Sequence, residues 1–295
     1  MDASGTRYTF HLRGDARWSN GARVTARNFV AAWRRVVDPA QGSPNADILR
    51  PVLHAADIIA GRSPVTMLGV SAPEDDRLVV QLEQPAPYFP ELLTHPATFP
   101  VYSEAAAATH DSAKWVSNGA YVLSNWTLGA RLELCKNPQY WNRHGVQIEL
   151  IRYIPVTDED AELRRYRAGE LDLTDNVPGA ALPEIRREIP RELLLAPILG
   201  TVYYGINLHS ARFAANQKLR QALSMAIDRR ALARALLVFG QSPAYGFVPP
   251  GTRNYDSQTW DWKSLPDAER VERAQSPLRR GRLLEGKTAS PAPPV

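Results

Sequence analysis

The sequence lacks several features that define common protein classes. It has a single cysteine, Cys135, among 295 residues, which excludes an internal disulfide and is too few for a structural zinc site. No run approaches the roughly 18 consecutive apolar residues that a membrane-spanning helix needs. The first residues show no basic segment followed by an apolar one, so we expect no export signal in this sequence.

Motifs of catalysis and cofactor binding are also missing. The six histidines show no HExxH spacing, and no GxSxG, P-loop or GxGxxG sequence occurs. The acidic clusters at 74–76 and 158–160 fit a solvated turn and a helix N-terminus, where carboxylates are favoured. Cys135 lies in an alternating apolar pattern typical of a small buried hydrophobe rather than a nucleophile. We therefore predict no catalytic residue, no metal site, no cofactor and no enzyme.

The composition is that of a folded protein with a modest positive charge. Hydrophobic residues make up 44% of the chain and the formal net charge is +4. Residues 274–295 contain four of the basic side chains and only one acidic side chain, so most of this charge belongs to the last segment. Basic pairs elsewhere fall on predicted helices rather than along one stripe, which argues against nucleic acid as a partner.

Strand and helix patterns alternate along the chain. Period-2 alternation, β-branched residues and hairpin patterns predict strands, and apolar residues at helical spacing predict helices. The expected strands are 8–13, 78–82, 126–134 with a hairpin, 148–154, 171–173 and 202–206. The expected helices are 25–37, 46–59, 157–168, 180–188 and 216–237. This interleaving indicates an α/β fold. The pattern decays after residue 250, and the Ala-, Gly-, Ser- and Pro-rich end predicts a disordered tail.

A series of spaced motifs resembles the family 5 solute-binding proteins of ABC importers, of the oligopeptide and murein-peptide type. In order, the motifs are Tyr8-Thr9-Phe10-His11-Leu12-Arg13, Trp18-Ser19-Asn20-Gly21, Val37-Asp38-Pro39, Asp57-Ile58-Ile59-Ala60-Gly61, Pro87-Tyr88-Phe89, Asn118-Gly119-Ala120-Tyr121, Asn137-Pro138-Gln139-Tyr140-Trp141, Tyr166-Arg167-Ala168-Gly169-Glu170 and Leu223-Ser224-Met225-Ala226-Ile227-Asp228-Arg229-Arg230. The resemblance runs from about residue 6 to residue 250.

The resemblance implies an α/β, type II periplasmic-binding-protein-like fold that closes on its ligand like a hinge. The expected fold is incomplete, with one extra domain and parts of both lobes. Residues 1–97 resemble most of the family-specific extra domain, and residues 98–199 the central part of lobe one. Residues 200–265 resemble the start of lobe two, and residues 266–295 form a divergent tail that we expect to be disordered.

The resemblance also implies peptide-binding residues. Asn45 stands where the family usually has an aromatic residue against the ligand. Asp175 and Asn176 belong to a run that matches a loop with main-chain and amide contacts to the peptide, and Asn176 is the preferred amide donor. Tyr203 and Gly205 lie in a segment that matches the hinge strand, where the family often has an acidic residue at the position of Gly205.

The departures from the family suggest a fragment. Family members have about 70 or more residues before the position of Tyr8, including a signal peptide, and over 200 after Pro250, so we expect truncation at both ends. Codons chosen for 278–286 and read one base later encode a family-like sequence, which favours a frameshift between Gln275 and Pro277. Sequencing the gene tests this hypothesis.

By resemblance, the function is that of the substrate-binding component of an ABC peptide importer, impaired in binding here. Its partners are short peptides, either oligopeptides or murein peptides, and a membrane permease for the intact relative. We expect a monomer that is periplasmic by resemblance, and cytoplasmic if expressed as written. The alternatives are a truncated interaction or scaffold protein without transport, or a non-functional frameshifted product. A hydrolase is the third possibility and has no motif behind it.

Overall fold

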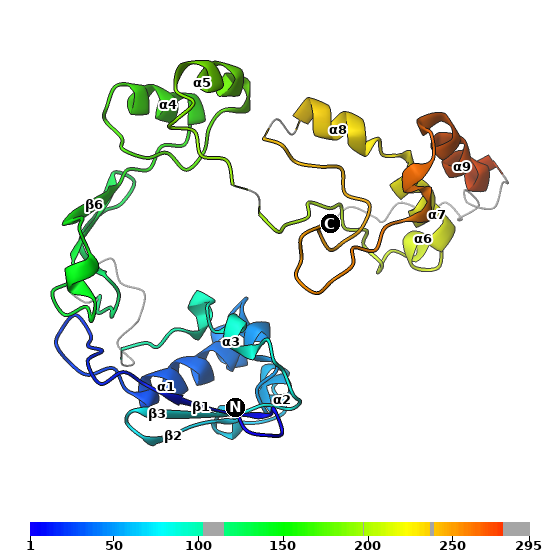
Figure 1. Cartoon of the computed structure of the whole chain (residues 1–295). Helices are drawn as coiled ribbons and strands as arrows, with labels where there is room; N and C mark the ends of the chain where they lie inside the picture. Colours follow the sequence, from blue (N-terminus) through cyan, green and yellow to red (C-terminus); the bar gives the residue numbers. More distant parts are fainter. Residues whose placement is uncertain (103–114, 197, 237–238, 280–295) are drawn as a thin grey trace, which may run out of the picture. The chain divides into compact units, whose positions relative to one another are not determined.

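The computed structural model describes residues 1–102, 115–196, 198–236 and 239–279 (Figure 1). The chain divides into two compact units, Met1–Pro155 and Val156–Val295, and each is described by itself. This division does not coincide with the expected family boundaries at 97/98, 199/200 and 265/266, which concern the family's domains and stay predictions.

The first unit begins with a small antiparallel sheet covered by a helix. Strands β1 (Arg7–His11), β3 (Arg77–Gln81) and β2 (Val70–Glu74) pair in the order β1-β3-β2. Helix α1 (Ala26–Val37) packs on β2 and β3 (Figure 1). It begins after Thr25, whose backbone N–H donates to Asn28 Oδ1 at 2.8 Å, and it buries Trp33 in the core. The predicted strands 8–13 and 78–82 and the helix 25–37 are confirmed.

Short helices complete this core. They are η1 (Pro39–Gln41), η2 (Ala46–Leu49), α2 (Ala55–Ile59), η3 (Val65–Met67), α3 (Phe89–Leu92) and η4 (Pro96–Thr98). The prediction of one helix over 46–59 is wrong. Pro51 has no N–H with which to continue the helical hydrogen bonds, so η2 ends at Leu49. His54 then adopts a left-handed conformation, with φ of 64°, before α2 begins.

A second antiparallel sheet follows in the same unit. Strands β4 (Tyr121–Thr127), β5 (Arg131–Lys136) and β6 (Leu150–Tyr153) pair in the order β4-β5-β6, with η6 (Arg143–Gly145) before β6. Gly129, with φ of 73°, supplies the left-handed position in the β4–β5 turn. The predicted hairpin and the strand at 148–154 are confirmed.

The buried amide of Asn137 joins the two loops at the ends of β4 and β5. Its Nδ2 donates to the Gly119 carbonyl at 2.8 Å, and its Oδ1 accepts the Gln139 N–H at 2.9 Å. Its backbone N–H donates to Ala120 O at 2.9 Å. The Ser19 N–H donates to Ser117 O at 2.7 Å, which ties the loop after β1 to the entry of β4. Three of the motifs behind the resemblance, at 18–21, 118–121 and 137–141, therefore form connected loops.

Among its described residues, the second unit contains helices and irregular segments but no strand. Its helices are α4 (Glu159–Arg167), η7 (Gly179–Ala181), α5 (Leu182–Glu188), α6 (Ala211–Ala214), α7 (Gln217–Ala226), α8 (Arg229–Leu236), η8 (Asp261–Ser264) and α9 (Asp267–Arg279). The helices predicted at 157–168 and 180–188 are confirmed. The strands predicted at 171–173 and 202–206 are absent here, because neither segment has a backbone pairing partner among the described residues.

The expected disordered tail is wrong for residues 267–279, which form α9. The helix packs against α7 and buries Arg270 and Ala274, although its sequence shows no continuous apolar stripe. Residues 280–295, the rest of the expected tail, lie outside the described residues.

The helix predicted at 216–237 is two helices, because Asp228 starts a new one. The Asp228 carboxylate accepts the Ala231 N–H at 2.9 Å, as an N-capping residue does, and this bond is the main cause of its lowered pKa. Arg229 donates to Ser224 O at 2.6 Å and to Ile227 O at 3.3 Å. Apolar residues continue at helical spacing on both sides of Asp228, so their spacing does not reveal the break between the two helices.

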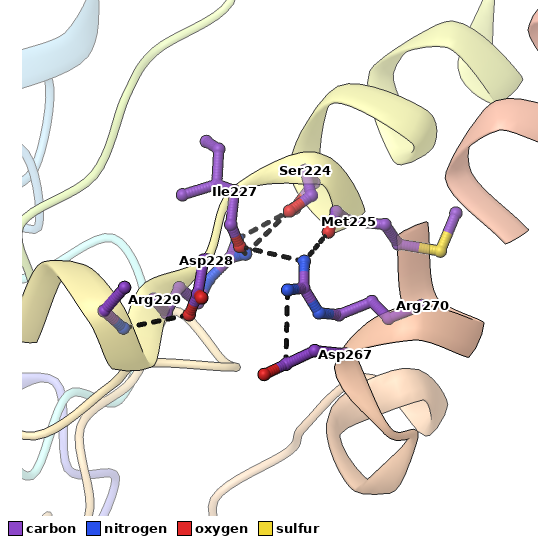
Figure 2. Close-up of polar contacts among 8 residues, drawn as sticks. Ser224, Met225, Ile227, Asp228, Arg229, Asp267 and Arg270 are labelled. Atoms are coloured by element: carbon purple, nitrogen blue, oxygen red, sulfur yellow. Dashed lines mark hydrogen bonds and ion pairs between the residues drawn. The ribbon is translucent and has the colours of Figure 1, made fainter. Parts of the chain in front are cut away.

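Arg270 of α9 closes the end of α7 (Figure 2). Its guanidinium donates to the carbonyls of Met225 and, at 3.2 Å, Ile227, and it pairs with Asp267 at 3.3 Å. These carbonyls lie at the negative end of the α7 dipole, where a cation is favoured. Arg270 is only 5% exposed, so its buried charge needs these acceptors: two backbone carbonyls and the carboxylate of Asp267.

We predict that Arg270→Met destabilises the second unit by about 2–4 kcal/mol, because it leaves the carbonyl of the buried Met225 without its guanidinium donor and Asp267 without its ion-pair partner. Urea denaturation measures the effect. Arg273→Met is the matched control in the same helix, since Arg273 is exposed and pairs with Asp261 at the surface. Equal stability of the two variants would contradict the role of Arg270.

We also predict that Asn137→Ala loosens the loops around β4 and β5, at a cost of about 1–3 kcal/mol for the buried groups that lose partners. Hydrogen exchange of amides in 119–139 should accelerate. Asn142→Ala is the control, because Asn142 is exposed and its side chain makes no hydrogen bond among the described residues. Unchanged protection in Asn137→Ala would rule out this role.

Candidate functional site

The five expected peptide-binding residues lie in both units. Asn45 belongs to the first unit, and Asp175, Asn176, Tyr203 and Gly205 belong to the second. The two units are described separately, so whether Asn45 meets the other four stays a prediction.

Asn45 lies at a sharp turn on the surface of the first unit. Gly42, with φ of 59°, reverses the chain, and the Asn45 N–H donates to Ser43 Oγ at 3.3 Å. The Asn45 carbonyl accepts the Ile48 N–H at 3.1 Å, which starts η2. The backbone of Asn45 is thus fixed, while its side chain is exposed and has no partner among the described residues.

Asp175 and Asn176 lie in an exposed loop between two braced helices. Arg167 of α4 donates to Glu184 at 3.0 Å and to Glu188 at 3.2 Å, both on α5. The Tyr166 hydroxyl donates to Glu192 at 2.5 Å, which raises the pKa of this tyrosine. The helices on either side are therefore held together, and the loop presents a carboxylate and an amide to solvent.

Tyr203 and Gly205 lie in an extended, irregular segment. Tyr203 is 64% exposed and meets the ring of Phe247 edge-on, at 5.2 Å between centroids. A Cβ at Gly205 would meet no atom within 4 Å, so neighbouring atoms do not require glycine there. Residues 201–206 form no backbone hydrogen bond within the described chain, which leaves their N–H and C=O groups available.

The described residues contain neither a candidate metal site nor a candidate membrane-spanning helix. No group of three His, Cys, Asp or Glu among them could hold a metal ion. Within the same residues, no helix combines the length and apolar character required to span a bilayer. The described part of the expected site offers exposed polar side chains and backbone groups without a backbone partner.

Sequence reasoning missed a cavity in the first unit. The residues that line it come from the loops after β1 and β5, namely Gly14, Asp15, Arg17, Gln139, Tyr140, Trp141, Arg143 and His144. The motif at 137–141 pointed to this region only as part of a family pattern. The cationic residues Arg17 and Arg143 lie far apart in sequence, so spacing could not bring them together.

The family model for "Bacterial extracellular solute-binding proteins, family 5 Middle" matches residues 1–280. The periplasmic oligopeptide-binding protein OppA of Salmonella typhimurium is 39% identical over 280 residues, or 92% of this chain and 51% of that protein. The probable deoxycholate-binding periplasmic protein YgiS of Escherichia coli is 37% identical, over 94% of this chain and 52% of its own length.

Solved structures agree with these sequence matches. The murein tripeptide-binding protein MppA of Escherichia coli has a TM-score of 0.88 at 31% identity, covering 95% of this chain and 56% of its own. OppA of Haemophilus influenzae, in complex with RPPGFSPFR, has a TM-score of 0.84 at 34% identity, with the same coverage.

The chain thus spans about half the length of the relatives it matches. These likenesses confirm the expected α/β, type II periplasmic-binding-protein-like fold. With the family match over nearly all of its residues, the chain belongs to family 5 of the bacterial extracellular solute-binding proteins.

Proposed function

We propose that this chain belongs to the peptide-binding component of an ABC peptide importer, of the oligopeptide or murein-peptide type. The observation that carries the proposal is its similarity, over more than nine-tenths of its residues, to proteins named for binding oligopeptides and murein peptides. A solved relative of this kind holds a peptide.

The exposed groups of the second unit suit an extended peptide. Residues 201–206 have free backbone N–H and C=O groups, which are the partners that a peptide main chain needs. Asn176 adds a side-chain amide that can donate and accept, and Tyr203 adds an aromatic face. Main-chain recognition depends little on ligand side chains, so a broad range of peptides can bind.

The same reasoning extends to partners and location. The relatives are named as periplasmic, which supports action in that compartment with a membrane permease as partner. The protein would act as a monomer, without a cofactor or nucleic acid. It would release its ligand unchanged, so no catalytic step is proposed.

We predict that residues 1–295 bind tri- to pentapeptides more weakly than micromolar in calorimetry. The expected contacts are exposed, so each hydrogen bond to the ligand replaces one to water and contributes little. Compared with a site that pairs both charged termini of the peptide, a site that leaves them without partners loses several kcal/mol of binding free energy. Asn176→Ala should weaken binding further, by about fivefold for one hydrogen bond.

Gln217→Ala is the matched control, because Gln217 is also an exposed amide of the second unit and lies outside the expected site. If Asn176→Ala and Gln217→Ala lose equal peptide affinity, Asn176 does not belong to the binding site. Absence of any saturable peptide binding would overturn the proposed function for this chain, and micromolar affinity would overturn the expected weakness. Tighter binding of deoxycholate than of peptides would favour the ligand for which YgiS is named.

The second candidate is an interaction protein without transport. The exposed apolar side chains of 198–208 favour it, with Val202 96% and Tyr204 84% exposed. Peptide titration separates the candidates, since an interaction protein has no need to bind free tri- to pentapeptides.

A further inference from the structure

A cavity of about 560 Å³ lies in the first unit, outside the expected peptide-binding residues. The loop after β1 contributes Asp15 and Arg17, and the loop after β5 contributes Gln139, Trp141, Arg143 and His144. Its volume falls within the usual range for small-molecule sites. None of the five expected peptide-binding residues lines it, so an inference about it stands apart from the proposed function.

The charged groups of this cavity favour an anion. Arg17 donates to Gly21 O at 3.2 Å, which uses one of its donors. Arg143 and His144 make no side-chain hydrogen bond or ion pair within the described chain. The acidic residue, Asp15, lies 4.0 Å from Arg13, which offsets its charge. The balance at the cavity is therefore positive, with cationic donors left for a ligand.

The loop that carries Arg143 and His144 is fixed before any ligand binds. Asn137 anchors its start, and successive turn bonds follow: Tyr140 N–H to Asn137 O at 3.2 Å, and Arg143 N–H to Tyr140 O at 3.0 Å. A Cβ at Gly145 would come within 2.9 Å of the Asn142 side chain, which shows how tightly the turn closes. A preorganised loop loses little entropy when it binds.

Trp141 gives the cavity a flat apolar surface. The guanidinium of Arg13 lies 3.4 Å from its ring centroid, a cation–π contact that fixes the indole. The indole is still 46% exposed, and it also lines a second cavity of about 190 Å³ with Leu12 and Phe29. Planar groups gain dispersion and stacking energy against such a surface.

From these features we propose that the cavity binds a small organic anion in which a carboxylate adjoins a planar apolar group. Arg143 receives the carboxylate, with Arg17 as a second cation lining the same cavity, and Trp141 receives the planar group. The same chemistry occurs in a free aromatic acid and in the carboxyl terminus of a peptide that ends in an aromatic residue.

Benzoate is the probe, and benzamide is its neutral counterpart of nearly the same shape. Ligand-observed NMR titration of the full chain at constant ionic strength should show saturable binding of benzoate, with benzamide bound at least about fivefold more weakly. Arg143→Gln keeps hydrogen-bond donors and removes the charge, and it should weaken benzoate by a similar factor. Arg186→Gln is the control, since Arg186 is an exposed arginine of the second unit that does not line the cavity.

Absence of saturable benzoate binding, equal affinity for benzamide, or equal effects of the two arginine substitutions would overturn the proposal. Trp141→Phe gives an independent test, because it keeps a ring and should retain part of the affinity. The peptide Gly-Gly-Phe and its C-terminal amide distinguish the two ligand sources, a free aromatic acid and the carboxyl terminus of a peptide. Displacement of benzoate by the acid but not the amide assigns the site to peptide carboxyl termini, and displacement by neither assigns it to free acids.

Discussion

The amide of Asn137 satisfies backbone groups in the two loops that bound the β4–β5 hairpin, and the position of both loops depends on this arrangement. Backbone groups that leave a sheet must find another partner, since a buried polar group without one costs free energy. In the second unit, the guanidinium of Arg270 donates hydrogen bonds to carbonyls at the end of α7, which have no partner within that helix. In both units, one buried side chain holds segments that secondary structure alone does not join.

Asn137 in the first unit and Arg167 in the second unit position the candidate binding groups. Asn137 fixes the turn that carries Trp141 and Arg143, so that cavity is lined by groups on a rigid loop. In the second unit, the ion pairs of Arg167 hold α4 and α5 while the loop with Asn176 between them remains exposed. The proposed binding groups thus lie on irregular backbone that regular or buried elements support.

The sequence predicts elements well where the local signal is complete. Thr25 and Asn28 specify the start of α1, and Gly129 and Gly169 occupy turns that require positive φ. It fails where tertiary contacts decide. Asp228 divides an apolar pattern that continues past it, and α9 gains its order from packing that its own residues do not indicate. For the site, resemblance supplied Asn45, Asp175, Asn176, Tyr203 and Gly205, but no local pattern tells whether they meet.

The extended segment at 198–208 has a consequence for how this protein behaves at different concentrations. No charged residue lies between Glu192 and Arg212, so this stretch lacks the side chains that keep exposed strands apart. Pairing with another part of the same molecule proceeds at a rate that does not depend on concentration, whereas pairing with a second molecule accelerates as concentration rises. Rapid dilution after synthesis or refolding would therefore favour the intramolecular partner, and a crowded solution would favour association.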